Sequence, residues 1–234
     1  MKLFKIAGLQ KLTLLDFPGK VACTIFTEGC NFRCPFCHNA SLVTRVGENE
    51  GYSTEYILDF LNKRQGIIEG VCISGGEPTL MPGLEEFICE VKNLGFCVKL
   101  DTNGTRPDIL RHLVSEGLVD YVAMDIKNSR EKYALTAGLC EEYDISKIEE
   151  SASFLMSGAV DFEFRTTVVD PLHDTDDFKL IGEWLAGNER FFLQKFIDSG
   201  DVIGRGLDAY PDEKMSEFLN TLKCLVPNAQ LRGM

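Results

Sequence analysis

Residues 21–39 read VACTIFTEGCNFRCPFCHN, a short apolar run followed by a polar loop that contains three cysteines. The run has the length and composition of a buried strand. Cys30, Cys34 and Cys37 then follow within eight residues, and a polar loop is not the usual place for buried core cysteines. The stretch therefore predicts a strand that ends in a site built from thiol groups.

Five further apolar runs follow along the chain: 70–74, 96–100, 118–124, 161–169 and 191–197. Amphipathic stretches fill the gaps, with start signals such as Ser53, Pro107, Asp174, Pro211 and a capping-box spacing from Ser146 to Glu149. Strands that alternate with helices indicate an α/β fold with a parallel sheet. A complete eight-fold barrel takes about 250 residues. We therefore expect a partial, open (β/α)6 TIM-like barrel, with a doubly wound open sheet as the alternative.

The expected organisation is one domain over residues 1–234 of the 234-residue chain. Residues 1–20 would form a short N-terminal extension, read as a hairpin or strap. Residues 21–200 would form the partial barrel, and residues 201–234 a C-terminal segment with one amphipathic helix at about 211–222.

Composition narrows the class of protein. With 44% apolar and 26% charged residues the chain is an ordinary globular one. A net charge of −12 argues against nucleic acid as a main ligand. No apolar run approaches the roughly 20 residues of a membrane span, and the first residues lack the apolar core of a signal peptide. We therefore expect a cytoplasmic protein, in which the three clustered cysteines of nine would bind metal or do redox chemistry rather than form structural disulfides.

Unusual loops follow the next three predicted strands. SGGEP spans 74–78, DTNG spans 101–104 and DIK spans 125–127. Each alone is read as an ordinary turn, but ligands in parallel α/β folds bind at the carboxyl ends of the strands. Their shared placement predicts one site on that rim. His173 and Gln194 belong to the same rim without an assigned role, and a loop histidine such as His173 is expected to be solvated.

Three thiolates on one loop can hold a cubic [4Fe-4S] cluster and leave its fourth iron without a protein ligand. Two other metal sites remain open at this point. A structural zinc site could use the three cysteines with His38, although His38 is adjacent to Cys37 and poorly placed for one tetrahedron. Residues 34–38 also match the CxxCH pattern of covalent haem attachment, which is typical of exported proteins.

The combination of CxxxCxxC, GGEP, DTNG and DIK at successive strand ends resembles the radical S-adenosylmethionine (SAM) superfamily. Within it, the chain resembles the glycyl-radical-enzyme activating proteins. Residues 8–39 are similar to anaerobic ribonucleoside-triphosphate reductase activating proteins and, more distantly, to pyruvate formate-lyase activases. The similarity runs from about Gly8 to Phe196.

This resemblance implies that Cys30, Cys34 and Cys37 hold a [4Fe-4S] cluster whose open iron binds the amino and carboxylate groups of SAM. One electron from the reduced cluster would cleave SAM to methionine and a 5′-deoxyadenosyl radical. That radical would take a hydrogen atom from a glycine of a partner glycyl radical enzyme, expected to be the anaerobic ribonucleotide reductase. A low-potential donor such as flavodoxin or ferredoxin would supply the electron.

The resemblance also assigns the SAM contacts. Gly75, Gly76 and Glu77 would hold the ammonium end of the methionine. Phe36 would lie by the adenine, and a monovalent cation would lie near Asp101 and Asp125. Arg165 would reach the SAM carboxylate, with a simple ion-pair role as the alternative. The residues implied for the ribose and carboxylate end are Asp101, Thr102, Asn103, Asp125 and Lys127.

The sequence is compatible with three classes of function. The first is the activase that acts on a protein, with pyruvate formate-lyase as a second target. The second is a radical SAM enzyme for a small molecule, because a fold does not determine its substrate. The third is a zinc-binding protein without catalysis. Residues 38–71 contain no cysteine, so additional clusters are not expected.

Overall fold

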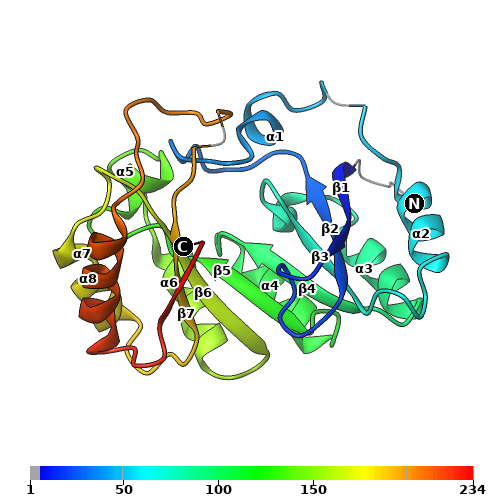
Figure 1. The fold of residues 1–234 in the computed structure, drawn as a ribbon. Coiled ribbons are helices and arrows are strands. Elements are labelled where there is room, and N and C mark those ends of the chain that lie inside the picture. The colour runs from blue at the N-terminus through cyan, green and yellow to red at the C-terminus, as the bar shows by residue number, and fades with distance from the viewer. Residues whose placement is uncertain (1–5, 49, 199, 234) are drawn as a thin grey trace.

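The computed structural model describes residues 6–48, 50–198 and 200–233, in which strands and helices alternate as the sequence predicts (Figure 1). The strands are β1 (Ile6–Thr13), β2 (Ala22–Thr27), β3 (Gly70–Gly75), β4 (Cys97–Thr102), β5 (Tyr121–Asp125), β6 (Asp161–Val168), β7 (Phe191–Lys195) and β8 (Gln230–Arg232). The helices are α1 (Ala40–Thr44), α2 (Thr54–Asn62), the 3₁₀ turn η1 (Pro78–Leu80), α3 (Leu84–Asn93), α4 (Pro107–Ser115), α5 (Tyr133–Ala137), α6 (Ser146–Met156), α7 (Thr175–Trp184) and α8 (Asp212–Lys223).

All strands join one sheet, and their spatial order follows their order in the chain from β1 to β8. β1 is antiparallel to β2, and every later pair is parallel. A doubly wound sheet would reverse its strand order at a switch point. The sequential order therefore excludes that alternative and matches the expected partial barrel, which stays open between its edge strands β1 and β8.

The main core lies where apolar stripes of the helices pack on the strands. On α3 the predicted face is buried, since Leu84, Phe87, Ile88 and Val91 are all at most 4% exposed. Burying a large apolar side chain contributes about 1.5–3 kcal/mol. Such stripes hold the helices against the sheet and orient the loops that follow each strand.

Three details differ from the sequence prediction. The N-terminal extension contributes a full strand, β1, to the sheet, and its first five residues lie outside the described part. β8 was not predicted, because three residues give no periodic signal; Arg232 in it pairs with buried Glu163 at 2.7 and 2.8 Å. The capping box at Ser146 is absent, because the Asp144 carboxylate accepts hydrogen bonds from the Ser146 amide and hydroxyl instead.

The predicted start of α7 is confirmed. Asp174 accepts a hydrogen bond from the Asp177 amide at 3.1 Å, and the Asp177 side chain accepts one from the Asp174 amide at 2.9 Å. This reciprocal cap fixes the angle at which α7 leaves the rim of the barrel. The division into extension, barrel and C-terminal segment remains a prediction.

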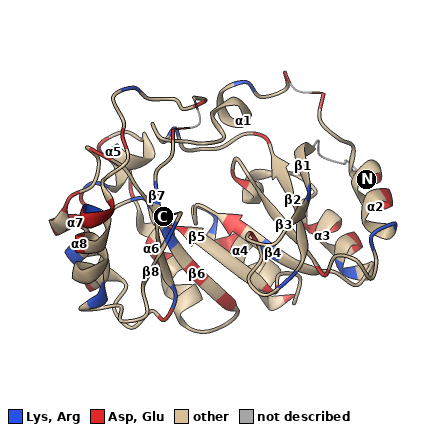
Figure 2. Ribbon diagram, viewed as in Figure 1, with Lys and Arg blue, Asp and Glu red and all other residues tan. Residues whose placement is uncertain are grey.

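Charged residues of both signs lie along most helices and loops (Figure 2). Across residues 6–48, 50–198 and 200–233, every helix is too short or too polar to cross a bilayer. Charge also occurs inside the barrel, where the Lys99 side chain is only 1% exposed. A buried ammonium group needs partners, and these partners belong to the site described next.

Candidate functional site

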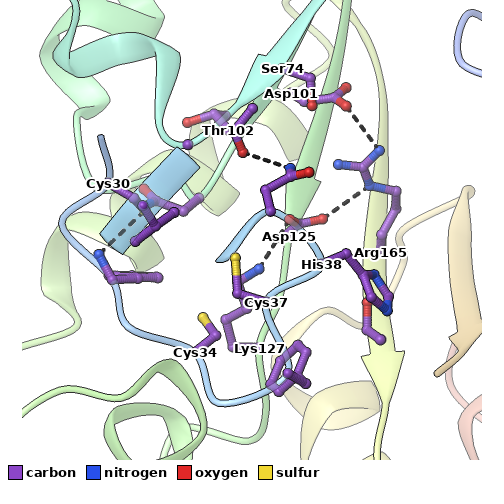
Figure 3. A pocket seen from close by; sticks show the side chains of 18 of the residues that line it. Cys30, Cys34, Cys37, His38, Ser74, Asp101, Thr102, Asp125, Lys127 and Arg165 are labelled. Atoms are coloured by element: carbon purple, nitrogen blue, oxygen red, sulfur yellow. Dashed lines mark hydrogen bonds and ion pairs between the residues drawn. The ribbon is translucent and has the colours of Figure 1, made fainter. Parts of the chain in front are cut away.

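A pocket of about 230 Å³ lies at the carboxyl ends of the parallel strands (Figure 3). This volume is a little below the roughly 300–1,000 Å³ that is typical of small-molecule sites. The pocket wall combines the cysteine loop with residues from the ends of β3 to β7. The predicted site residues that line it are Cys30, Cys34, Phe36, Cys37, Gly75, Gly76, Asp101, Thr102, Asn103, Asp125, Lys127 and Arg165.

The cysteine loop, residues 28–39, presents its thiols to this pocket. Cys34 is buried, and Cys30 and Cys37 are half-buried. The Cys30 sulfur accepts a hydrogen bond from the Phe32 amide at 3.3 Å. Burial raises the pKa of the Cys34 thiol to about 12, while the Lys127 ammonium acts in the opposite direction. Because a coordinated thiol is deprotonated by the metal itself, this shift describes the free thiol and does not prevent metal binding.

Three distant segments hold the cysteine loop in place. The Arg33 amide donates to the Ala137 carbonyl at 3.0 Å, and the Gly204 amide donates to the Pro35 carbonyl at 2.7 Å. His38 Nε2 lies 2.9 Å from the Ile197 carbonyl oxygen, and the His38 ring stacks on Phe196. These contacts tie the loop to α5 and to the segment after β7.

The geometry separates the metal sites that the sequence left open. In the part of the chain that the structure describes, no three Cys, His, Asp or Glu side chains converge as the ligands of a single ion do. A structural zinc site requires such convergence, whereas a cubic cluster binds each thiolate at a different iron. His38 makes its contact with Ile197 and not with the thiols. With His38 engaged by Ile197, the loop offers three thiols, which is the donor set of a [4Fe-4S] cluster with one open iron.

The two glycines of GGEP are required by the neighbouring backbone. A Cβ atom at Gly76 would lie 1.9 Å from the Gly29 carbonyl oxygen, and one at Gly75 would lie 2.4 Å from the Thr27 amide nitrogen. Hydrogen bonds join the same segments, from the Gly76 amide to the Thr27 carbonyl at 3.0 Å and from the Glu77 amide to the Gly29 carbonyl at 2.8 Å. The start of the cysteine loop is thus packed directly against the end of β3.

Glu77 does not face the pocket, contrary to the expectation that it meets the SAM ammonium group. It is 0% exposed, and its carboxylate accepts four hydrogen bonds. Two come from the amide and hydroxyl of Thr79, and two from the Thr102 hydroxyl at 2.8 Å and the Asn103 amide at 2.7 Å. Burial raises the pKa of Glu77, and the four donors oppose this. Glu77 therefore positions the ends of β3 and β4.

Five charged side chains form a continuous series across β4, β5 and β6. Lys99 pairs with Asp101. Arg165 bridges Asp101 at 3.3 Å and Asp125 at 3.0 Å, as Figure 3 shows. Lys127 completes the series at 3.0 Å from Asp125. Arg165 thus forms the ion pairs of the alternative expectation and also lines the pocket, while its contact with the SAM carboxylate stays a prediction.

The series holds both carboxylates in their charged form. Burial alone would raise the pKa of Asp125, but Arg165 and Lys127 outweigh it and lower the pKa to about 2. The pKa of Asp101 is lowered as well, because Arg165 and Lys99 outweigh its burial. Burial alone would lower the pKa of Lys127, but Asp125 raises it. The pocket thus offers charges that are set before any ligand arrives.

Asn103 and Phe36 extend the pocket wall toward the cysteine loop. Asn103 Nδ2 donates to Asn31 Oδ1 at 2.8 Å and lies 3.8 Å from the Cys30 sulfur. Phe36 is 4% exposed, and the Lys127 ammonium lies 6.0 Å from its ring centroid. The loop after β4 and the cysteine loop therefore form one connected wall.

Sequence reasoning gave no role to several residues that the structure brings to this site. Gln194 lines the pocket together with Ser74 and Thr167. His173 is 1% exposed, so the expectation of a solvated histidine is wrong. Its Nε2 lies 2.9 Å from the Lys127 carbonyl oxygen, and burial lowers its pKa. The available signal is the position of Gln194 three residues before the end of the predicted strand 191–197.

Comparisons of sequence show which family the chain is similar to. A sequence profile of the radical SAM superfamily matches residues 24–157. A Methanocaldococcus jannaschii protein described, by inference, as a glycyl-radical enzyme activating enzyme is 31% identical over 235 residues, covering 97% of this chain and 95% of its own length. A pyruvate formate-lyase-activating enzyme of Clostridium pasteurianum is 30% identical over 141 residues, covering 55% of this chain and 54% of that enzyme.

Comparisons of structure agree on the fold. Streptococcus suis SuiB bound to S-adenosylmethionine has a TM-score of 0.69 at 13% identity, over 88% of this chain and 49% of that chain. The structure of anSMEcpe with bound AdoMet has a TM-score of 0.64 at 20% identity, over 88% and 61%. This chain thus spans about half of SuiB and three-fifths of anSMEcpe, and the likeness supports the fold alone.

Proposed function

The chain belongs to the radical SAM superfamily and to its glycyl-radical enzyme activating enzymes, and we propose that it forms a glycyl radical on a partner enzyme by reductive cleavage of SAM. One observation carries this proposal. Three thiols on one loop share a single pocket with the ends of β3, β4 and β5, where GGEP, DTNG and DIK lie.

We propose that Cys30, Cys34 and Cys37 hold a [4Fe-4S] cluster. When bound, the cluster and SAM would supply an electron and a carbon radical that can take a hydrogen atom from a glycine Cα. The chain's own residues would shield the cluster from water and donate hydrogen bonds to its ligands. Buried Phe32 and Phe36 lie between the cysteines and exclude water, and the Phe32 amide donates to the Cys30 sulfur. Hydrogen bonds to cluster sulfurs and burial both tune the reduction potential.

For SAM we propose contacts with residues that line the pocket. Gly75 and Gly76 present backbone groups near the cysteine loop, and Phe36 presents its ring to the adenine. Glu77 does not contact SAM in this proposal, and instead holds Thr102 and Asn103 in position by accepting their hydrogen bonds. The charged and polar residues proposed for the ribose and carboxylate end are Asp101, Thr102, Asn103, Asp125, Lys127 and Arg165.

The resemblance also implies a monovalent cation near Asp101 and Asp125. The Arg165 guanidinium already bridges these two carboxylates at 3.3 and 3.0 Å. We therefore propose that such a cation binds only if the Arg165 side chain shifts, because a second cation between the same oxygens would meet like charge.

We propose the anaerobic ribonucleoside-triphosphate reductase as the partner. The similarity of residues 8–39 to activating proteins of that reductase supports this choice. The 31% identical relative supports a glycyl radical enzyme as the partner and does not name which one. The partial match to a pyruvate formate-lyase-activating enzyme makes pyruvate formate-lyase the second candidate. Flavodoxin or ferredoxin in the cytoplasm would supply the electron.

An anaerobic spin experiment tests this function. The reconstituted protein is reduced, mixed with SAM and the reductase, and examined by electron paramagnetic resonance. We expect a glycyl doublet on the reductase and 5′-deoxyadenosine in solution. The Cys34→Ala variant is the control and should give neither. Formation of 5′-deoxyadenosine without a doublet on either candidate partner would favour a small-molecule substrate and contradict the proposal.

A further inference from the structure

Neutral polar side chains in the pocket differ from the charged ones in one respect. The pocket carboxylates Asp101 and Asp125 are paired with the basic side chains of Arg165 and Lys127. By contrast, among the residues that the structure describes, the side chains of Ser74, Thr167 and Gln194 line the pocket without a hydrogen-bond partner. Such a side chain is available to a ligand, and leaving it unpaired after a ligand displaces water from the pocket is costly.

Thr167 and Gln194 stand side by side. They are register partners in the parallel pair of β6 and β7. Thr167 follows Arg165 by two residues, so both side chains lie on the same face of β6, toward the pocket. Ser74, on β3, precedes Gly75 and belongs to the part of the pocket proposed for SAM. Thr167 and Gln194 are therefore a part of the wall that the SAM assignment leaves unused.

The chemistry of this pair matches a peptide segment. A glycine has no side chain, so the hydrogen-bonding groups nearest to its Cα are the N–H and C=O groups of the peptide units on its two sides. A carboxamide supplies one acceptor and two donors, and a hydroxyl supplies a donor and an acceptor. Both are neutral, as peptide groups are, whereas a nucleotide or an organic acid would call for charged partners.

We propose that Thr167 and Gln194 bind the peptide groups on the two sides of the partner's radical glycine and so position its Cα in the pocket. This inference rests on the proposed function. Neither side chain gains or loses a proton or an electron, because their role is to orient the substrate. Loss of either one should leave SAM cleavage intact and reduce the fraction of cleavage events that yield a glycyl radical.

Two near-isosteric variants remove the hydrogen bonds, Gln194→Met and Thr167→Val. The matched control is Lys195→Met, next to Gln194 on the same strand, whose side chain pairs with Asp212 away from the pocket. Three quantities are measured. They are the SAM affinity, the 5′-deoxyadenosine formed without partner, and the glycyl spins per 5′-deoxyadenosine with the anaerobic ribonucleoside-triphosphate reductase. A labelled synthetic peptide that spans the reductase's radical glycine provides a binding measurement without turnover.

For Gln194→Met we expect about tenfold fewer spins per 5′-deoxyadenosine, which corresponds to about 1.4 kcal/mol. Peptide affinity should fall to a similar extent, while SAM affinity and partner-free cleavage stay within twofold of the wild type. Thr167→Val should lower the number of spins per 5′-deoxyadenosine about fivefold. Lys195→Met should leave the spin ratio, the peptide affinity and the SAM affinity unchanged.

Two results would overturn the assignment. Unchanged spin ratios and peptide affinity in both variants would show that the pair does not contact the glycine segment. A parallel loss of SAM affinity and partner-free cleavage would show that the pair serves SAM. Failure of the proposed function is distinguishable from both, because the wild-type protein itself would then give no doublet on the reductase.

Discussion

Replacing Glu77 by Gln tests whether this carboxylate positions the site or contacts the ligand. Its two oxygens accept four hydrogen bonds from Thr79, Thr102 and Asn103, and the side chain is fully buried. A carboxamide keeps one acceptor oxygen and replaces the other by an NH2 group. In either orientation that NH2 group meets a backbone N–H, from Asn103 or from Thr79, so at least one buried donor loses its partner.

The cost follows from these contacts. A hydrogen bond to a charged group contributes about 1.5–3 kcal/mol, and an unsatisfied buried donor costs about 1–3 kcal/mol. Removal of the buried charge offsets part of this, consistent with the raised pKa of Glu77. The expected net loss is about 2 kcal/mol. For a chain of this size such a loss lowers the melting temperature by about 4–8 °C.

The assay is anaerobic thermal unfolding of the reconstituted protein, together with the SAM dissociation constant. The control is Glu86→Gln, an exposed carboxylate on α3, which should change the melting temperature by less than about 2 °C. A Glu77→Gln protein with wild-type melting temperature and at least tenfold weaker SAM binding would refute the positioning role. Glu77 would then contact the ammonium group, as the sequence alone suggested.

Three further predictions concern the thiols and the charged series. Replacing any one of the three loop cysteines by Ala should abolish SAM cleavage, measured as 5′-deoxyadenosine. The control Cys89→Ala, on α3, should cleave SAM at a rate within about twofold of the wild type. A loop-cysteine variant that still cleaves SAM would contradict the cluster assignment. The pKa of Asp125 is lowered to about 2 from its ordinary 3.8, so the stability from its ion pairs is present above about pH 4 and is lost as the pH falls through about 2. Asp125→Asn should remove about 2 kcal/mol of this pH dependence in acid unfolding, and an unchanged profile would argue against the pairing. The SAM affinity of the wild type should be the same in potassium chloride as in choline chloride, because Arg165 occupies the space between Asp101 and Asp125. The Arg165→Gln variant opens this space, so its SAM affinity should differ at least fivefold between the two salts. A fivefold difference in the wild type would contradict the bridging role of Arg165.

Much of the fold and of the candidate site could be predicted from local pattern. The six apolar runs are all strands of the sheet, and the stripe on α3 is buried as the periodicity indicates. The predicted site residues, apart from Glu77, line one pocket. This succeeded because parallel strands bring their carboxyl ends to one rim, so motifs that follow strands meet without further information.

Prediction was weaker where the partner of a polar group lies far along the chain. His173 is a loop histidine in sequence, yet it is buried against the Lys127 carbonyl 46 residues away. The strand β8 is visible only through its pairing with β7 and the ion pair of Arg232 with Glu163. Neither contact leaves a periodic or compositional trace.

The sequence by itself determined the alternation of strands and helices, the rim on which the polar loops gather, and the three thiols of the cysteine loop. Only the tertiary structure decided which polar groups are already used by one another and which are free for a ligand. The Glu77 carboxylate accepts hydrogen bonds from Thr102 and Asn103. The side chains of Thr167 and Gln194, by contrast, have no hydrogen-bond partner in the part of the chain that the structure describes. The reason is physical: hydrogen bonds are short and directional, so their partners are set by how the strands pack and not by distance along the chain.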